Sequence, residues 1–206
     1  MTVFDRKNHW ETVYSTKSLE EVSWYQPEPT TSLQFIKEFA LPKTSKVIDV
    51  GGGDSFLVDY LLAEGFEDIS VLDISETALE KAKKRLGEKA EKVKWIIADI
   101  ATFVPTEKYD LWHDRAVFHF LTKEEEIQHY LEITQKNIAI AGILIIGTFS
   151  EVGPKKCSGI EIKQYSKDSM TDLFKHAFDP LKCISIDHNT PFNTIQNFIF
   201  CGFLKK

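Results

Sequence analysis

The chain lacks any apolar run long enough to cross a membrane, which needs about 20 consecutive apolar residues. Its first residues, MTVFDRKNHW, also lack the apolar core of a secretory signal peptide. Basic residues are not in excess, since the net charge at pH 7 is −6, and phosphate binding needs a concentrated basic face. These absences argue against a membrane or nucleic-acid partner.

Cysteine is scarce, and Cys157, Cys183 and Cys201 are widely spaced and odd in number. This spacing offers neither a disulfide framework nor a metal-ligand pattern. We therefore expect reduced thiols, a cytoplasmic location and no bound metal. A length of 206 residues suits one domain with a full core, so we expect residues 1–206 to form a single domain.

The most informative stretch is VIDVGGGDS, residues 47–55. An apolar, β-branched run leads into three glycines, and a helical pattern begins at Phe56. A strand, a glycine turn and a helix in this order cradle a nucleotide-type ligand, because glycine lets the ligand approach the backbone. Phe56 stands where a dinucleotide fingerprint needs its third glycine, which argues against a dinucleotide-dependent oxidoreductase. The turn suits a ligand without a pyrophosphate, and Asp49 suits a cationic one; S-adenosylmethionine (SAM) meets both demands.

Strands and helices alternate along most of the chain, which predicts a mainly parallel sheet with helices on both faces. The expected strands are residues 46–50, 68–72, 94–98, 109–112, 142–149, 181–187 and 196–204. The expected helices are residues 5–14, 31–39, 56–64, 76–86, 123–139 and 167–178, with Thr31 or Ser32 capping the second. The last two strands lie close together in sequence, so we expect a hairpin-like addition with one strand antiparallel.

An acid follows each of the first four expected strands: Asp49, Asp73, Asp99 and Asp114. In an open α/β sheet, ligands bind outside the carboxyl ends of the strands. Asp73 lies about 20 residues after Gly53, a suitable distance for holding ribose hydroxyls. Asp99 is placed to accept from the amine of an adenine, and Asp49 could orient the turn or offset a ligand ammonium.

These motifs resemble those of the class I SAM-dependent methyltransferases along almost the whole chain. The matching residues are Asp49, Gly51 and Gly53 of a D-x-G-x-G motif, Asp73, Ala98-Asp99-Ile100, and YDLWHDRAVFH at 109–119. Ser55 departs from the family's usual third glycine. The resemblance implies an α/β, Rossmann-like three-layer sandwich whose seven-stranded, mostly parallel sheet has its last strand antiparallel. It also implies that SAM is bound and S-adenosylhomocysteine released, with cofactor contacts from Asp49, Gly51, Gly53, Asp73, Ile74, Asp99, Ile100 and Asp114.

Residues 9–26, HWETVYSTKSLEEVSWYQ, resemble the lead-in of a bacterial group with small-molecule or unassigned acceptors. They also faintly resemble an element of some protein-lysine methyltransferases. In such enzymes this segment folds over the cofactor, so we expect residues 1–30 to form a flap. Trp24 and Tyr25 would then contact SAM, since an aromatic face beside a sulfonium is favourable. Alternatively, these two aromatics simply cover the edge of the core.

Methyl transfer from a sulfonium is an in-line displacement that positioning and exclusion of water can largely catalyse. The candidates for direct chemistry are His113, Arg115 and His119. Arg115 could hold an acceptor oxyanion, and either histidine could act as a base. Equally, Arg115 could pair with an acid, and His119 could be a satisfied core histidine. Tyr165, Cys157 and His188 could wall the acceptor pocket, although ordinary surface positions are favoured for Cys157 and His188.

We therefore predict a methyltransferase that acts on a small-molecule acceptor, as a monomer or homodimer. One alternative is a protein-lysine methyltransferase, which predicts an open, acidic mouth in place of a closed pocket under Trp24. Another is a non-catalytic SAM-binding protein, which would bind SAM without turning over any acceptor.

Overall fold

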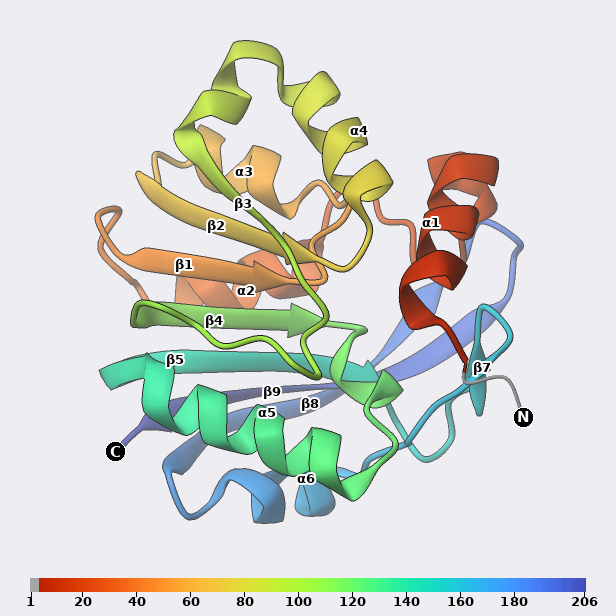
Figure 1. Ribbon diagram of the computed structural model, residues 1–206. Helices are drawn as coiled ribbons and strands as arrows, with labels where there is room; N and C mark the ends of the chain where they lie inside the picture. The colour runs from red at the N-terminus through yellow and green to blue at the C-terminus, as the bar shows by residue number, and fades with distance from the viewer. Residues whose placement is uncertain (1–3) are drawn as a thin grey trace.

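A seven-stranded sheet in the order β3-β2-β1-β4-β5-β9-β8 forms the centre of the molecule (Figure 1). The computed structural model describes residues 4–206, so residues 1–3 of the expected flap lie outside the described residues. The strands are β1 (Lys46–Val50), β2 (Asp68–Asp73), β3 (Val93–Ile97), β4 (Tyr109–Arg115), β5 (Ile138–Phe149), β8 (Phe178–Asn189) and β9 (Ile195–Lys205). Strands β1 to β5 pair in parallel, and β9 runs antiparallel between β5 and β8. The predicted fold, with its last strand antiparallel, is confirmed.

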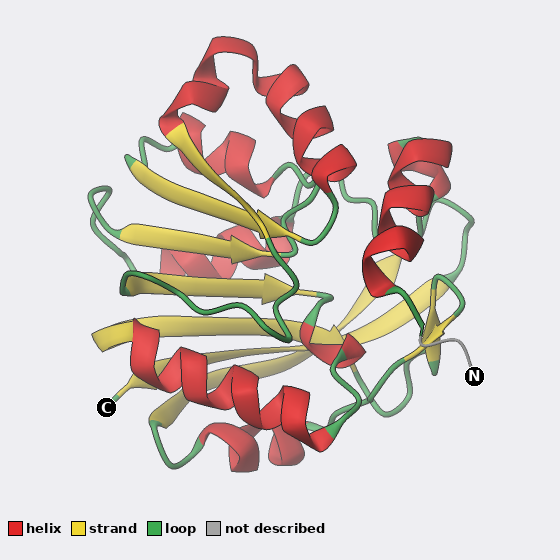
Figure 2. Cartoon of the chain, viewed as in Figure 1, coloured by secondary structure: helices red, strands yellow, loops and turns green. Residues whose placement is uncertain are grey.

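Helices pack on both faces of this sheet (Figure 2). They are α1 (Arg6–Thr16), α2 (Thr30–Glu38), α3 (Leu57–Ala63), α4 (Glu76–Leu86), α5 (Glu124–Asn137) and α6 (Lys167–Phe174). Short 3-10 turns cover Leu19–Glu21 (η1), Gly87–Lys92 (η2) and Phe118–Phe120 (η3). Two strands, β6 (Lys156–Cys157) and β7 (Ile160–Glu161), form a small hairpin inside the long loop expected after β5.

Alternation along the strands explains why both faces are covered. Val47 and Leu111 pack into one core with α2, α3 and α4, whereas Ile48 and Trp112 pack into the other with α5 and α6. All four side chains are fully buried. Successive residues of a strand point to opposite faces, so an unbroken apolar run needs a helical layer on each side.

Two expected boundaries are wrong. Helix α2 begins at Thr30 with Pro29 at its N-cap, so neither Thr31 nor Ser32 caps it; the Ser32 hydroxyl has another partner, described below. Strand β8 begins at Phe178, where a helix was expected, because α6 ends at Phe174 and a turn follows.

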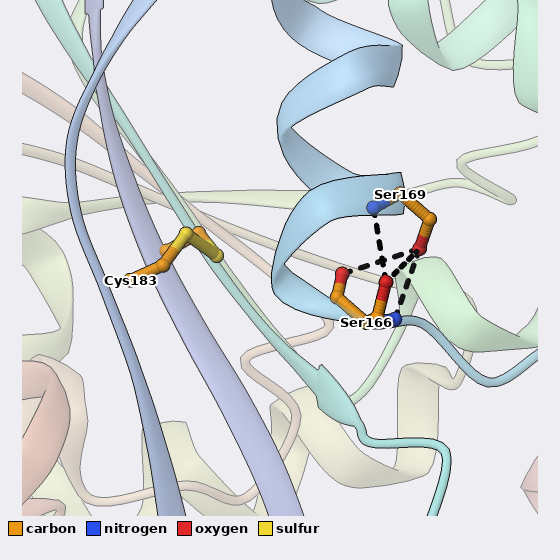
Figure 3. The surroundings of a disulfide bond; sticks show 4 residues. Ser166, Ser169 and Cys183 are labelled. Carbon is orange, nitrogen blue, oxygen red and sulfur yellow. Dashed lines mark hydrogen bonds between the residues drawn. A yellow bond between two sulfur atoms is a disulfide. The ribbon is translucent and has the colours of Figure 1, made fainter.

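The expectation of reduced thiols is also wrong for two of the cysteines. Cys183 of β8 and Cys201 of β9 stand directly opposite each other in the antiparallel ladder, with 4.1 Å between their Cα atoms, and form a disulfide (Figure 3). Their separation of 18 residues carries no pairing signal, whereas the register of the hairpin brings them together. Beside them, Ser166 and Ser169 cap the start of α6 (Figure 3).

Helix α1 stands beyond the carboxyl ends of the central strands, at the right of Figure 1. The carboxylate of Glu11 accepts from the backbone N–H of Glu76, 2.7 Å away, and of Thr77, 3.2 Å away. Since the N-terminus of a helix favours negative charge, Glu11 fastens α1 to the start of α4. Among residues 4–206, no helix combines the length and apolar character of a membrane span.

Candidate active site

A cavity opens at the carboxyl ends of β1, β2 and β4 and is lined by residues of α1. Its floor carries Gly51, Asp73, Ile74, Asp99 and Ile100. The N-terminal segment covers it with Arg6, Trp10, Tyr14 and Trp24. Its remaining wall includes Arg115, Phe120, Phe149, Cys157 and Phe198. A second, smaller cavity lies beside it and contains Tyr25, Asp49 and His113. The two cavities share Tyr14, Trp24, Gly51 and Arg115.

The glycine turn has no room for side chains. Gly51 and Gly53 have φ angles of +67° and +45°, in the region that favours glycine. A Cβ on Gly51 would overlap the side chain of Val117. A Cβ on Gly53 would lie 2.9 Å from both the Asp73 carboxylate and the Tyr14 hydroxyl. The turn therefore brings its bare backbone up to the cavity, as a cradle for a nucleoside requires.

Asp73 lies at the end of β2, beside that turn. Its Oδ1 accepts from the Ser75 N–H at 2.8 Å, while Oδ2 faces Gly53. Burial, and then the charges of Asp49 and Glu11, raise the pKa of Asp73 to about 7. A buried carboxylate with a free oxygen suits the two hydroxyls of a ribose, which can replace the lost hydration.

Asp99 lies after β3 and is largely engaged by protein groups. Arg6 donates through one nitrogen to both carboxylate oxygens at 3.0 Å, and the Ala101 N–H donates to Oδ1 at 2.9 Å. The other guanidinium nitrogen of Arg6 contacts Glu126 at 2.8 Å. A carboxylate offers about four acceptor positions, so Oδ2 of Asp99 keeps one position for an adenine amine. Ile74 and Ile100 offer apolar surface for the ring nearby.

Asp49, His113 and Ser32 form a buried chain of hydrogen bonds. Asp49 and His113 are neighbours across β1 and β4, and His113 Nδ1 lies 2.7 Å from Asp49 Oδ1. His113 Nε2 lies 2.8 Å from the Ser32 hydroxyl of α2. An ionised carboxylate only accepts, so His113 donates to Asp49 through Nδ1, and Nε2 shares a hydrogen bond with the serine hydroxyl. Both nitrogens of His113 are thus occupied, and these hydrogen bonds tie the ends of β1 and β4 to helix α2.

Asp114 points away from the cavity, toward α5. It accepts from the hydroxyl of Tyr130 at 2.9 Å and from the N–H groups of Val117 and Phe118. Burial raises the pKa of Asp114 to about 6. Neighbours in a strand face opposite sides, so His113 and Arg115 share the cavity side while Asp114 shapes the turn after β4.

His119 lies behind the aromatic wall of the cavity. Its ring stacks on Phe149 with 4.6 Å between centroids, and neither ring nitrogen has a hydrogen-bond partner among residues 4–206. Burial, and then the charge of Arg115, lower the pKa of His119 to about 3, so the ring is neutral.

Two side chains of the sheet contact backbone carbonyls of the flap segment after α1. Arg115 donates to the carbonyl of Trp24 at 3.1 Å, and His188 lies with Nε2 2.7 Å from the carbonyl of Ser23. His188 is a buried residue of β8, so its expected surface position is wrong. The indole of Trp24 meets Trp10 edge-on at 5.6 Å, and Tyr25 packs against Phe56.

Several residues of the site were not predicted from the sequence. Arg6, Trp10 and Tyr14 all line the cavity, and their spacing of four residues puts them on one face of α1. That spacing was the available signal, but it does not say which surface the face covers. Cys157, expected on the surface, is buried and lines the cavity, and burial raises its pKa to about 11.

Replacing Arg6 with glutamine should loosen α1. The ion pairs with Asp99 and Glu126 are partly shielded from water, so their loss should cost about 1 kcal/mol locally. Backbone amides of α1 should then exchange hydrogen roughly fivefold faster by mass spectrometry. Lys7→Gln, an exposed neighbour, is the matched control, and equal exchange in the two variants would refute this role for Arg6.

Comparisons with known proteins agree on one family. The family model described as a methyltransferase domain matches residues 41–191. The eEF1A lysine and N-terminal methyltransferase of Mus musculus is 25% identical over 126 residues, covering 60% of this chain and 18% of that protein. Malonyl-acyl-carrier protein O-methyltransferase 2 of Ilyobacter polytropus is 26% identical over 106 residues, covering 51% of this chain and 39% of that protein. The chain thus spans well under two thirds of the length of these curated relatives.

Among solved structures, the N-methyltransferase NodS of Bradyrhizobium japonicum in complex with S-adenosylhomocysteine matches with a TM-score of 0.73. The match covers 98% of this chain and 99% of that one, at 14% sequence identity. At this identity, the likeness concerns the fold.

Proposed function

This chain belongs to the class I SAM-dependent methyltransferases, and we propose that it transfers the methyl group of SAM to a small-molecule acceptor. The observation that carries the proposal is the cover over the cavity. Trp10, only 9% exposed, packs edge-on against both Trp24 and Phe120, at 5.6 and 5.2 Å between ring centroids. A cavity roofed by packed aromatics suits a molecule that can be enclosed, whereas a lysine presented by a folded protein needs an open mouth.

The described residues divide into those that bind the nucleoside and those that surround the reacting end. When bound, SAM supplies a methyl group activated by its sulfonium. In our proposal Asp73 accepts from the ribose hydroxyls, Asp99 accepts from the adenine amine, and Gly51 and Gly53 admit the ligand to the backbone. Trp24 lies over the shared part of the two cavities, where an aromatic face favours a cation.

Catalysis in this site rests on positioning and exclusion of water. His119 is neutral, but its low pKa makes it a weak base, and both nitrogens of His113 are hydrogen-bonded. The acceptor should therefore react as a neutral nucleophile or as an anion that is already ionised. Holding it in line with the methyl group, away from water, is the contribution that this chain can make.

One observation favours the alternative of a protein-lysine methyltransferase. A relative matched over 60% of this chain is named as a lysine and N-terminal methyltransferase. The non-catalytic alternative shares every binding residue and differs only in turnover. Both are outcomes of the test below.

Calorimetric titration with SAM, S-adenosylhomocysteine and NAD tests the first step. We expect micromolar binding of the first two ligands and none of NAD. Incubation with SAM carrying a tritiated methyl group, and with separated small-molecule and protein fractions of a cell extract, then tests the acceptor. Label in the small-molecule fraction supports the proposal, label in protein supports the lysine alternative, and binding without label supports the non-catalytic one.

A cytoplasmic location and a monomeric or homodimeric state are also part of our proposal. Cell fractionation and sedimentation of the purified protein test them. The disulfide between Cys183 and Cys201 counts against a cytoplasmic location, since a reducing compartment favours free thiols, so the fractionation result decides between the two.

A further inference from the structure

Arg115 is a half-buried cation without an ion-pair partner among residues 4–206. Its five N–H donors have one hydrogen-bond acceptor among residues 4–206, the carbonyl of Trp24 at 3.1 Å. Burial lowers the pKa of Arg115 to about 10, so it stays charged at neutral pH. The chain's other arginines differ: Arg6 contacts two carboxylates, and Arg85 contacts two others. Since a buried charge is costly unless it is paired, the environment of Arg115 is incomplete.

The acid whose charge acts on Arg115 does not neutralise it through an ion pair. Asp49 acts on the charge of Arg115 from a distance, but no ion pair joins them among the described residues, and Asp49 is bonded to His113. Burial keeps the nearby Cys157 a neutral thiol, with its pKa raised to about 11. An anion that pairs with Arg115 would therefore come from outside the described residues.

The surroundings of the guanidinium are aromatic. Arg115 lies over the ring of Phe198, with 5.3 Å between the guanidinium carbon and the ring centroid. Phe198 packs on Phe149 at 4.5 Å between centroids, and both rings line the cavity together with Phe120. Such walls accept a flat apolar body on its faces or edges.

A second incomplete polar group lies against the same wall. The ring of His119 is wholly buried, stacks on Phe149 and leaves both nitrogens without a partner. A neutral imidazole can donate one hydrogen bond and accept another. His119 lies behind this wall and does not line the cavity, so a ligand in the cavity would have one polar end, at Arg115, and an apolar body against Phe149 and Phe198.

We propose that Arg115 is the receptor for a carboxylate on the acceptor, and that the acceptor is a small, flat, apolar molecule carrying one such anion. This inference rests on the proposed methyltransferase function and names its substrate class. One guanidinium balances one negative charge, and its planar fork matches a carboxylate. A dianion such as a phosphate ester fits less well, because Asp49 and Asp73 already place negative charge nearby.

A carboxylate could also reach Arg115 from the methionine end of SAM, because Arg115 lines both cavities. The two sources are separable. S-adenosylhomocysteine carries that carboxylate, whereas 5′-methylthioadenosine has the same nucleoside and thioether without it. If Arg115 serves the cofactor, Arg115→Met weakens the first ligand and spares the second.

The experiment is calorimetry on the full chain with benzoate and its neutral counterpart benzamide, each titrated into protein saturated with S-adenosylhomocysteine. For the wild type we expect benzoate to bind about 10- to 100-fold more tightly than benzamide, the worth of a charge-assisted hydrogen-bonded pair. Arg115→Met should abolish this preference, and Arg115→Lys should keep only part of it. Because both changes alter the hydrogen bond to the Trp24 carbonyl, any weakening of S-adenosylhomocysteine should be matched by an equal weakening of 5′-methylthioadenosine. Lys175→Met, which removes an exposed charge just after α6, is the control and should bind like the wild type.

The proposal is overturned if the wild type binds benzoate no better than benzamide, a result that needs no variant. It is also overturned if Arg115→Met weakens S-adenosylhomocysteine about tenfold while 5′-methylthioadenosine is unaffected. In both cases cofactor binding by the wild type leaves the methyltransferase function intact. Failure of the wild type to bind S-adenosylhomocysteine at all would instead contradict the proposed function.

Discussion

Replacing Asp73 with alanine should weaken the binding of S-adenosylhomocysteine by about 10- to 100-fold, since it removes charge-assisted hydrogen bonds to both ribose hydroxyls. Asp73 is buried at the end of β2, and its Oδ2 faces the glycine turn. Calorimetry on the variant measures the effect, and circular dichroism checks its folding. Asp172→Ala, which removes an exposed acid of α6, is the control. Unchanged affinity in a folded Asp73 variant would contradict the proposal that Asp73 binds the ribose.

The same residue should make cofactor binding depend on pH. The pKa of Asp73 in the free protein is about 7, and only the carboxylate can accept from both hydroxyls. Affinity should therefore fall about tenfold for each pH unit below 7 and level off above it. In Asp73→Asn the affinity should be lower and should not change between pH 5 and pH 8. A wild-type profile that is equally flat would contradict the assignment.

Folding of the ligand-free protein should respond to this group with the opposite sign. A carboxyl whose pKa rises on folding, here from 3.8 to about 7, contributes stability that is fully present below the lower value. That contribution is lost as the pH rises through the upper one. The free protein is therefore destabilised at neutral pH by the buried carboxylate of Asp73, and hydrogen bonds from a bound ribose would offset this cost.

The parts of this site that could be predicted from sequence are the local ones. Residues 47–55 predict a strand followed by a turn, because three consecutive glycines after a β-branched run favour a tight turn over a continued strand or helix. Asp49, Asp73 and Asp99 were placed at the cavity by the rule that parallel strands end at one edge. The same rule placed Asp114 there too, but strand pleating turns its side chain toward Tyr130. The position of a residue at the end of a strand does not tell on which face of the sheet its side chain lies.

The parts that could not be predicted depend on contacts between distant segments. His188 supports the carbonyl of Ser23, 165 residues away, and Cys183 meets Cys201 only because the register of β8 on β9 is fixed. The lack of an anion beside Arg115 is also invisible in sequence, because Asp114 is adjacent in the chain but faces the other side of the sheet. Two opposite charges that are adjacent in the sequence therefore need not form an ion pair in the structure.

Replacing Trp24 with alanine should slow methyl transfer by at least about tenfold, because the indole lies over the junction of the two cavities. Without it, water reaches the reacting groups and the sulfonium loses an aromatic face. Turnover is measured as release of S-adenosylhomocysteine with the acceptor that the tritium assay identifies. The free energy of unfolding should fall by about 1–2 kcal/mol, because Trp24 is only partly buried.

Trp24→Phe separates the two effects that Trp24→Ala combines. A phenyl ring keeps an aromatic face toward the cavity, so turnover should recover most of its rate while the contact with Trp10 stays weakened. The backbone carbonyl that accepts from Arg115 is present in both variants, so neither change removes that hydrogen bond. If Trp24→Ala lowers the melting temperature by several degrees yet turns over normally, Trp24 covers the edge of the core and the flap has no part in catalysis. If both variants are slow and stable, the full indole is required, and the roof over the cavity is a determinant of which acceptor fits.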